Sequence, residues 1–213
     1  MSTHKVPTPR LWAGAVVCGL VCLFGGSGLA MAAQDPVQIT FTLEGCRNDG
    51  TFPLPNASGD YICPDANYVT GNLQKGWNEL DLVPHRVTAY NNSGGNQTYS
   101  FIVAGDYTWT AGSSTGWDVI SPLVLNTSLS DAGCNAAVSG PQTITPSGSG
   151  TGGADQTIYR LVTIPHPDDL TCVYDYYERL SLGSADFSGS SLQSNLWNHS
   201  LGSQGIVHRA ALI

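Results

Sequence analysis

Residues 112–116, GSSTG, match the G-x-S-x-G pattern of a nucleophilic serine. In hydrolases that use this motif, a sharp strand-to-helix turn exposes the serine hydroxyl beside an oxyanion hole. Here no helix-forming sequence follows the motif, and Trp109 and Trp117 flank it as they would flank a Gly/Ser-rich hairpin loop. We therefore predict a loop at this position and no catalytic role for Ser114.

The sequence His166-Pro167-Asp168-Asp169 places an imidazole beside two carboxylates. Such a group could bind a cation or transfer protons. Proline on both sides of the histidine favours an exposed turn instead, and the chain has neither a D-x-[DN]-x-[DN]-G calcium loop nor an H-x-x-x-H pair. We therefore predict no metal site, no cofactor and no enzymatic activity. A secreted hydrolase is the last of three hypotheses for the function.

Tryptophan side chains are the other candidates for ligand contacts, at positions 77, 109, 117 and 197. Trp109 and Trp117 are the strongest of these, because they stand at the two ends of the Gly/Ser-rich loop. Exposed indoles stack on the apolar faces of sugars, so a carbohydrate-binding module is the second hypothesis. Aromatic residues in strands more often belong to the core, and we expect that role for both residues.

Cysteine usage indicates the redox compartment. Two of the six cysteines lie in an apolar N-terminal stretch, and the other four are Cys46, Cys63, Cys134 and Cys172. An even number in an exported chain predicts disulfides. Four cysteines allow three pairings, and closure between neighbours in sequence favours Cys46–Cys63 and Cys134–Cys172. Zinc is disfavoured because no pair among the four has the x₂₋₄ spacing of a thiolate site.

The N-terminus predicts export. Lys5 and Arg10 precede an uncharged, largely apolar stretch at residues 11–33, which ends in the small-x-small sequence AMA at residues 30–32. These features define a secretory signal peptide, which we place at residues 1–33; an uncleaved membrane anchor is the alternative. Because the export signal looks bacterial, we expect a protein that crosses the inner membrane, is secreted or held at the cell surface, and has no membrane association after cleavage.

The charge balance limits the classes of partner. The formal net charge is -8, and only 11% of the residues are charged. Phosphate backbones are bound by clustered Lys and Arg, which this chain lacks, so nucleic acid is excluded as a partner. The remaining partner classes are another surface protein and a glycan.

Period-two alternation of apolar residues replaces helical periodicity along residues 34–213. Residues 37–43 alternate strictly, and further strands are expected at residues 78–90, 98–103, 117–125, 157–164 and 171–182. We expect a bulge or edge kink at Pro84 and turns at residues 91–96 and 105–106. In the last strand, the inward phase comprises Cys172, Tyr174, Tyr176, Leu180 and Leu182, with Glu178 as the exception.

One-sided strands of this kind predict an all-β fold, a disulfide-linked antiparallel β-sandwich. Residues 140–156 are rich in Ser, Thr, Gly and Pro and could be a linker between two smaller β units. A Cys134–Cys172 bond would span this stretch, which favours a long loop within a single domain at residues 34–213.

Three stretches carry a resemblance: FTLEGC at 41–46, GWNELDLVP at 76–84 and TCVYDYYERL at 171–180. Together they resemble the N-terminal region of very large bacterial exported proteins built from prealbumin-like and immunoglobulin-like β modules. The resemblance implies an immunoglobulin-like or prealbumin-like sandwich in an adhesin-like protein, and it supplies no site residue. The pattern breaks down near residues 205–209, so we expect a truncated product. The leading hypothesis is a secreted or cell-surface interaction or structural module without enzymatic activity.

Overall fold

The computed structural model describes residues 38–50, 63–74, 76–109, 114–150, 154–187, 192–198 and 206–211. The predicted signal peptide at residues 1–33 therefore lies outside the described residues. The contacts of the chain separate Met1–Ala32 from Ala33–Ile213, and every described element belongs to the second unit. None of the described segments forms a helix that is long and apolar enough to span a membrane.

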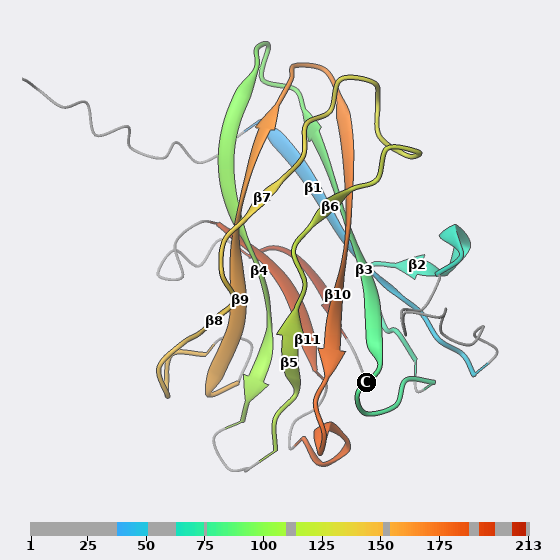
Figure 1. The fold of residues 1–213 in the computed structure, drawn as a ribbon, viewed down its shortest axis with the longest axis vertical. Helices are drawn as coiled ribbons and strands as arrows, with labels where there is room; N and C mark the ends of the chain where they lie inside the picture. Colours follow the sequence, from blue (N-terminus) through green and yellow to red (C-terminus); the bar gives the residue numbers. More distant parts are fainter. Residues whose placement is uncertain are drawn as a thin grey trace, which may run out of the picture. The chain divides into compact units, whose positions relative to one another are not determined.

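The described strands form two antiparallel sheets that pack face to face (Figure 1). The first sheet has the order β2 (Tyr68–Val69), β1 (Ile39–Cys46), β3 (Leu82–Asn91), β10 (Thr171–Leu180) and β5 (Trp117–Ile120), and β6 (Val124–Leu125) also pairs with β10. The second has the order β12 (Ile206–Ala211), β11 (Gln193–Asn198), β4 (Gln97–Thr108), β9 (Gln156–His166) and β7 (Val138–Ser139), and β8 (Thr143–Ile144) also pairs with β9. Short 3-10 helices occur at η1 (Asp65–Asn67) and η2 (Ser184–Asp186).

The core lies between the sheets and follows from the alternation in the sequence. Along β1, Ile39, Phe41 and Leu43 are buried, whereas the residues between them are partly or fully exposed. Phe41 meets Tyr99 of β4 edge to face, with ring centroids 5.5 Å apart, so the inward phases of the two sheets interlock. The predicted antiparallel β-sandwich is confirmed.

Both disulfides have the pairing that neighbour closure favours. Cys46 bonds to Cys63 with Cα atoms 6.0 Å apart, and Cys134 bonds to Cys172 with Cα atoms 5.6 Å apart. In each bond, one cysteine is a buried strand residue and the other lies in an irregular segment. Each bond therefore fastens a loop to the sandwich, and a disulfide of this kind is typically worth about 2–4 kcal/mol.

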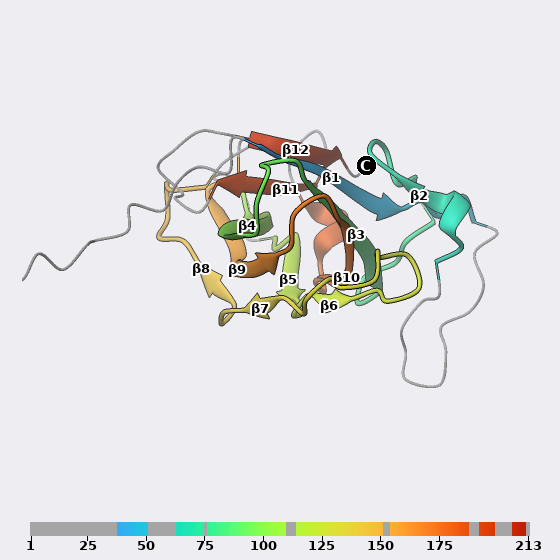
Figure 2. The same ribbon diagram turned by 90° about the horizontal axis from the view of Figure 1, so that it is seen from above.

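Residues 119–150, which we call the bridging segment, connect the two sheets. The strand expected at residues 117–125 is divided around Pro122 into β5 and β6, both of which pair with β10. Farther along, β7 and β8 pair with β9 in the other sheet. Figure 2 shows β8, β7 and β6 in a row along one border of the unit, in front of β9 and β10. Both sheets thus combine strands from before and after residues 140–156.

One local expectation is wrong, and of the bulge or edge kink expected at Pro84 only the bulge is contradicted. Gly105 and Asp106 do not turn the chain, because β4 continues to Thr108 and Gly105 pairs with strands on both sides. Glycine is needed there for close packing: a Cβ atom would lie 2.5 Å from Cδ1 of Trp117. No bulge occurs at Pro84 either, because the register of β3 against β10 passes it unbroken. Pro84 lies just beyond the last β3 residue paired with β1, where a missing N–H is tolerated.

Candidate functional site

Ser114 lies on the connection between β4 and β5, and its surroundings do not match a nucleophile elbow. Its hydroxyl donates to the carbonyl oxygen of Asp186 at 3.0 Å. The chain then enters a strand, β5, rather than the helix that the motif requires. The preceding residues of the motif, 112 and 113, lie outside the described residues. Ser114 therefore has the geometry of a loop residue whose hydroxyl ties two connections together.

His166 is buried at the end of β9, so the expected exposed turn is wrong for this residue. Its Nε2 lies 2.9 Å from the carbonyl oxygen of Leu170, and its Nδ1 lies 2.7 Å from the hydroxyl of Tyr99. A carbonyl only accepts, so Nε2 carries the proton and Nδ1 accepts from Tyr99. Burial lowers the pKa of His166. Both nitrogens of the neutral imidazole thus have a hydrogen-bond partner.

The two carboxylates after His166 belong to the turn that precedes β10. Asp169 has a φ of 56° and accepts a hydrogen bond from the Tyr90 hydroxyl at 2.7 Å. The backbone N–H of Asp168 donates to Oδ1 of Asn96 at 3.0 Å. In the part of the chain that the structure describes, no group of His, Cys, Asp or Glu residues is arranged to hold a metal ion.

The tryptophans do not form a stacking surface. Trp117, a candidate ligand-binding residue, is fully buried in the core. Trp109 is half-buried and meets the ring of Phe187 edge-on, with centroids 6.4 Å apart. Trp77 donates its indole N–H to the carbonyl oxygen of Cys46 at 3.1 Å, and Trp197 is buried on β11. These four side chains offer no exposed, coplanar pair to a sugar.

Glu178 was expected to be the exception to the inward phase of its strand, but the structure places it in the core. It occupies the inward phase of β10 between Tyr176 and Leu180, and it is completely buried. Burial raises the pKa of Glu178 to about 8, the nearby charge of Asp106 adds to the rise, and hydrogen bonds from Ser194 and Tyr176 oppose it. The carboxyl group is therefore largely protonated at neutral pH, as expected for a carboxyl group in apolar surroundings.

The contacts of Glu178 join the two sheets. Ser194 of β11 donates to Oε2 at 2.5 Å, and Tyr176 of β10 donates to Oε1 at 3.3 Å. The carboxyl group thus connects a strand of the first sheet to a strand of the second through the middle of the sandwich. Asp106 of β4 is also buried, and its carboxylate accepts from the N–H of Gln193 at 2.9 Å. Two acidic groups consequently lie in the interior at the same end of the sandwich.

His85 of β3 packs beside the rings of Tyr176 and Trp117, with ring centroids 5.2 Å and 5.8 Å away. It is fully buried, with Nδ1 3.0 Å from the carbonyl oxygen of Val83, so Nδ1 carries the proton and Nε2 faces the interior. Neither Nε2 of His85 nor Nε1 of Trp117 has a hydrogen-bond partner among the described residues. Burial lowers the pKa of His85 to about 4. We call His85, Asp106, Trp117, Tyr176, Glu178 and Ser194 the Glu178 cluster.

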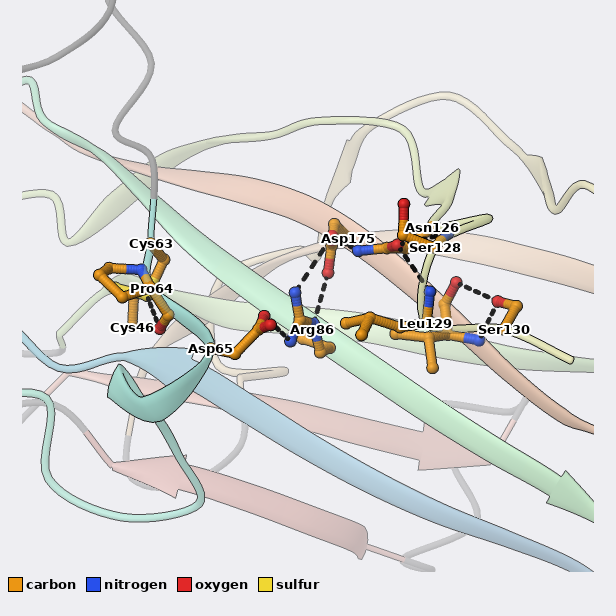
Figure 3. Close-up of polar contacts among 11 residues, drawn as sticks. Cys46, Cys63, Pro64, Asp65, Arg86, Asn126, Ser128, Leu129, Ser130 and Asp175 are labelled. Carbon is orange, nitrogen blue, oxygen red and sulfur yellow. Dashed lines mark hydrogen bonds and ion pairs between the residues drawn. A yellow bond between two sulfur atoms is a disulfide. The ribbon is translucent and has the colours of Figure 1, made fainter.

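A second polar group covers the outer face of the first sheet (Figure 3). Arg86 is largely buried there and bonds to Asp175 at 2.8 Å and to Asp65 at 3.0 Å, and its guanidinium lies 3.9 Å above the ring of Tyr68. Asn126 donates to the same Asp175 at 2.6 Å. Arg86 thereby fastens η1 and β2, next to the Cys46–Cys63 bond, against the sheet. Each of its three nitrogens donates to one of these carboxylates, which gives this group a structural role.

Comparison with known proteins adds no relative. No family model matches the chain, and neither the curated proteins nor the solved structures give a significant match.

Proposed function

We propose that this protein is a secreted or cell-surface β-sandwich module that makes structural or protein–protein contacts and has no enzymatic activity. The observation that carries the proposal is the pair of disulfides, each of which anchors an irregular segment to a buried strand cysteine. Disulfides persist in oxidising compartments, which supports a place outside the cytoplasm. Export across a bacterial inner membrane, cleavage near residue 33 and an immunoglobulin-like or prealbumin-like type of sandwich belong to the same proposal.

A non-catalytic role is supported by the separate positions of the three residues that could do chemistry. Ser114 donates to a backbone carbonyl, His166 is engaged by Tyr99 and Leu170, and Asp169 accepts from Tyr90. A serine nucleophile needs its base within hydrogen-bond reach. These hydrogen bonds of Ser114, His166 and Asp169 are each made to other residues and not to one another. The buried position of Trp117 weakens the carbohydrate-binding alternative.

Recovery of the exported protein tests its compartment. The full chain should be processed to a mature protein beginning at Ala33 or Gln34, and an alkylating reagent without reductant should add no mass. Matched samples treated with reductant should take up four labels, one on each of Cys46, Cys63, Cys134 and Cys172. Labelling of the folded, unreduced protein, or recovery of the whole chain in the membrane fraction, would contradict this part of the proposal.

Binding and turnover assays test the role itself. The mature protein should bind saturably to the surface of producing cells and should hydrolyse no ester, peptide or glycoside. Ser114→Ala should leave binding unchanged, because the hydroxyl only ties two connections together. Turnover by the pure protein that Ser114→Ala abolishes would establish a hydrolase, and the absence of any surface binding would remove the interaction role.

A further inference from the structure

The bridging segment differs in composition from the rest of the chain. Between residues 119 and 150 the only charged residue is Asp131, and there is no aromatic residue or histidine, although the whole chain carries a formal net charge of -8. The carboxylate of Asp131 accepts from the backbone N–H of Thr171 at 2.7 Å. This segment of an acidic protein is therefore almost free of charge.

Aliphatic side chains project from the same segment. The largest exposed fractions there are those of Val124 and Val138, at 66% each, and Leu129 and Ile144 are also exposed. Leu123 donates its N–H to Oγ of Ser139 at 3.0 Å, so the residue that leads into β6 lies beside β7, and the exposed Val124 and Val138 are next to these two residues in sequence. Leu161 of the adjoining β9 is exposed as well. Clustered exposure of this kind marks interaction sites more often than single apolar residues do.

Some polar groups of the segment and of the strand beneath it are engaged in hydrogen bonds, whereas others, such as Ser128 and Asn135, are exposed. Arg160 donates to the carbonyl oxygens of Ile120 and Gly140 from beneath the segment. The side chain of Gln142 accepts from the N–H of Ile120 at 2.7 Å and donates to the carbonyl oxygen of Asp118 at 3.1 Å. The Cys134–Cys172 bond fixes the middle of the segment to β10. The surface is thus preorganised, which reduces the entropy lost on binding.

We infer that the bridging segment is a self-association surface, at which a second copy of this chain binds in a two-fold symmetric dimer. The inference rests on the proposed interaction role and names the partner. Two copies of an acidic chain repel each other, and the repulsion is smallest where neither copy carries charge. A glycan would need aromatic platforms, which the segment lacks. A basic partner would be drawn to the acidic surfaces rather than to this one.

The size of the surface suits a dimer. A standard interface uses about 20–30 residues from each partner, and the bridging segment with the outer side of β9 supplies that number. The contact would be made through side chains rather than by pairing of strands. β6, β7 and β8 have two residues each, and very short edge strands are poor templates for a neighbouring chain.

Sedimentation of the mature protein over a range of concentrations tests the inference. The native protein should show a reversible monomer–dimer equilibrium. Val124→Asp combined with Val138→Asp should raise the dimer Kd by about 100-fold, because a symmetric contact sets the new charges against each other. Leu182→Asp is the matched control: Leu182 is 75% exposed on a turn away from the segment, and the dimer Kd should not change.

A charge-swap experiment decides whether the same face is used by both copies. The double variant Val124→Lys and Val138→Lys should also be monomeric, and mixing it with the double Asp variant should restore dimers. Monomers only in the native protein at about 100 µM, equal weakening by Leu182→Asp, or no restoration on mixing would overturn the inference. A monomeric native protein that still binds cells would overturn the self-association and leave the proposed function intact. A dimer that binds no cells would support the self-association and contradict the proposed function.

Discussion

The two ends of the sandwich each bury a histidine, and the two histidines differ in how well they are satisfied. At one end, His166 has a partner for each ring nitrogen, and Asn91 beside it donates to the carbonyl oxygens of His166 and Pro167, each at 3.1 Å. At the other end, His85 has one partnered nitrogen and packs against Tyr176, which donates to Glu178. Burial lowers the pKa of both histidines, but only the Glu178 end also holds a buried carboxyl group.

The difference teaches that burial alone does not fix what a polar side chain contributes. A buried group that has all its hydrogen-bond partners stabilises one arrangement, and any buried group whose pKa is shifted makes stability depend on pH. We therefore expect the His166 end to act as a hydrogen-bonded clamp that loses stability only at acid pH. The Glu178 end should also lose stability at alkaline pH.

The largest expected effect is that of Trp117→Ala, at the Glu178 end. The change leaves a cavity beside Gly105 and removes the indole that packs near Glu178. The free energy of unfolding should therefore fall by about 3–5 kcal/mol. Trp109→Ala, at a half-buried position, is the control and should cost less. Denaturant titrations of both variants measure this, and equal losses would show that the two indoles are packed alike.

The alkaline limb of the pH profile reports on the Glu178 end, whereas the histidines of both ends contribute to the acid limb. Because the pKa of Glu178 is raised in the folded state from 4.5 to about 8, its contribution to stability is complete at low pH and is lost as pH rises between these two values. For His85, whose pKa is lowered to about 4, and for His166, stability is lost as pH falls below about 6.5. Stability should therefore peak near pH 6.5, and should fall by about 2 kcal/mol between pH 6.5 and 8.

Glu178→Gln is the variant that tests this profile. A neutral amide cannot ionise, so the fall above pH 6.5 should disappear, while the loss of stability on acidification remains. Denaturant titrations at fixed ionic strength across pH 5–9 give both limbs. An unchanged alkaline limb in the variant would assign the fall to another group.

At the satisfied end, Tyr99→Phe should leave Nδ1 of the buried His166 without its donor. The free energy of unfolding should fall by about 1–3 kcal/mol, because an unpaired buried acceptor loses its solvation. Tyr90→Phe removes a similar hydroxyl from an exposed bond to Asp169 and should change stability by no more than about 0.5 kcal/mol. Equal losses in the free energy of unfolding for the two variants would show that the hydrogen bond from Tyr99 to His166 stabilises the fold no more than an exposed bond does.

The smallest effect expected is that of Ser194→Ala. Glu178 would keep its bond from Tyr176, so stability near pH 6 should fall by only about 1 kcal/mol. Since the Ser194 bond holds the pKa of Glu178 down, its loss should raise that pKa, so the alkaline fall should become deeper and continue to higher pH. In the Glu178→Gln background the same change should have no effect on the pH profile, and a shift there would point to a different titrating group.

Much of the fold could be predicted from period-two alternation and cysteine spacing. The inward phases of β1 and β4 were readable because Phe41, Tyr99 and Phe101 stand among polar neighbours. The cysteine pairing followed from closure between neighbours. These features are local in sequence, so no knowledge of the packed sheets was needed.

The Glu178 cluster could not be predicted because it depends on which strands face each other. The phase of β10 was the available signal, because Glu178 lies between two inward residues, but its charge led us to treat it as the exception to that phase. Gly105 and Asp106 read as a turn from their types alone. Only the position of Trp117 across the core explains why a glycine continues the strand. The burial of His166 could not be predicted, because the flanking prolines indicate only the local backbone conformation. They carry no information about Tyr99, whose hydroxyl binds the ring of His166.

The two disulfides also determine how far the protein can be stretched. The bonded cysteines are 38 residues apart in one case and 17 in the other. A pulling force applied at the ends of the chain cannot extend the residues inside either loop while the bonds are intact. At about 3.4 Å per extended residue, the larger loop withholds roughly 130 Å of contour length and the smaller one roughly 60 Å. Because β7, β8 and β9 lie inside the larger loop, tension that peels away the outer strands would leave much of the bridging segment enclosed in a covalent ring.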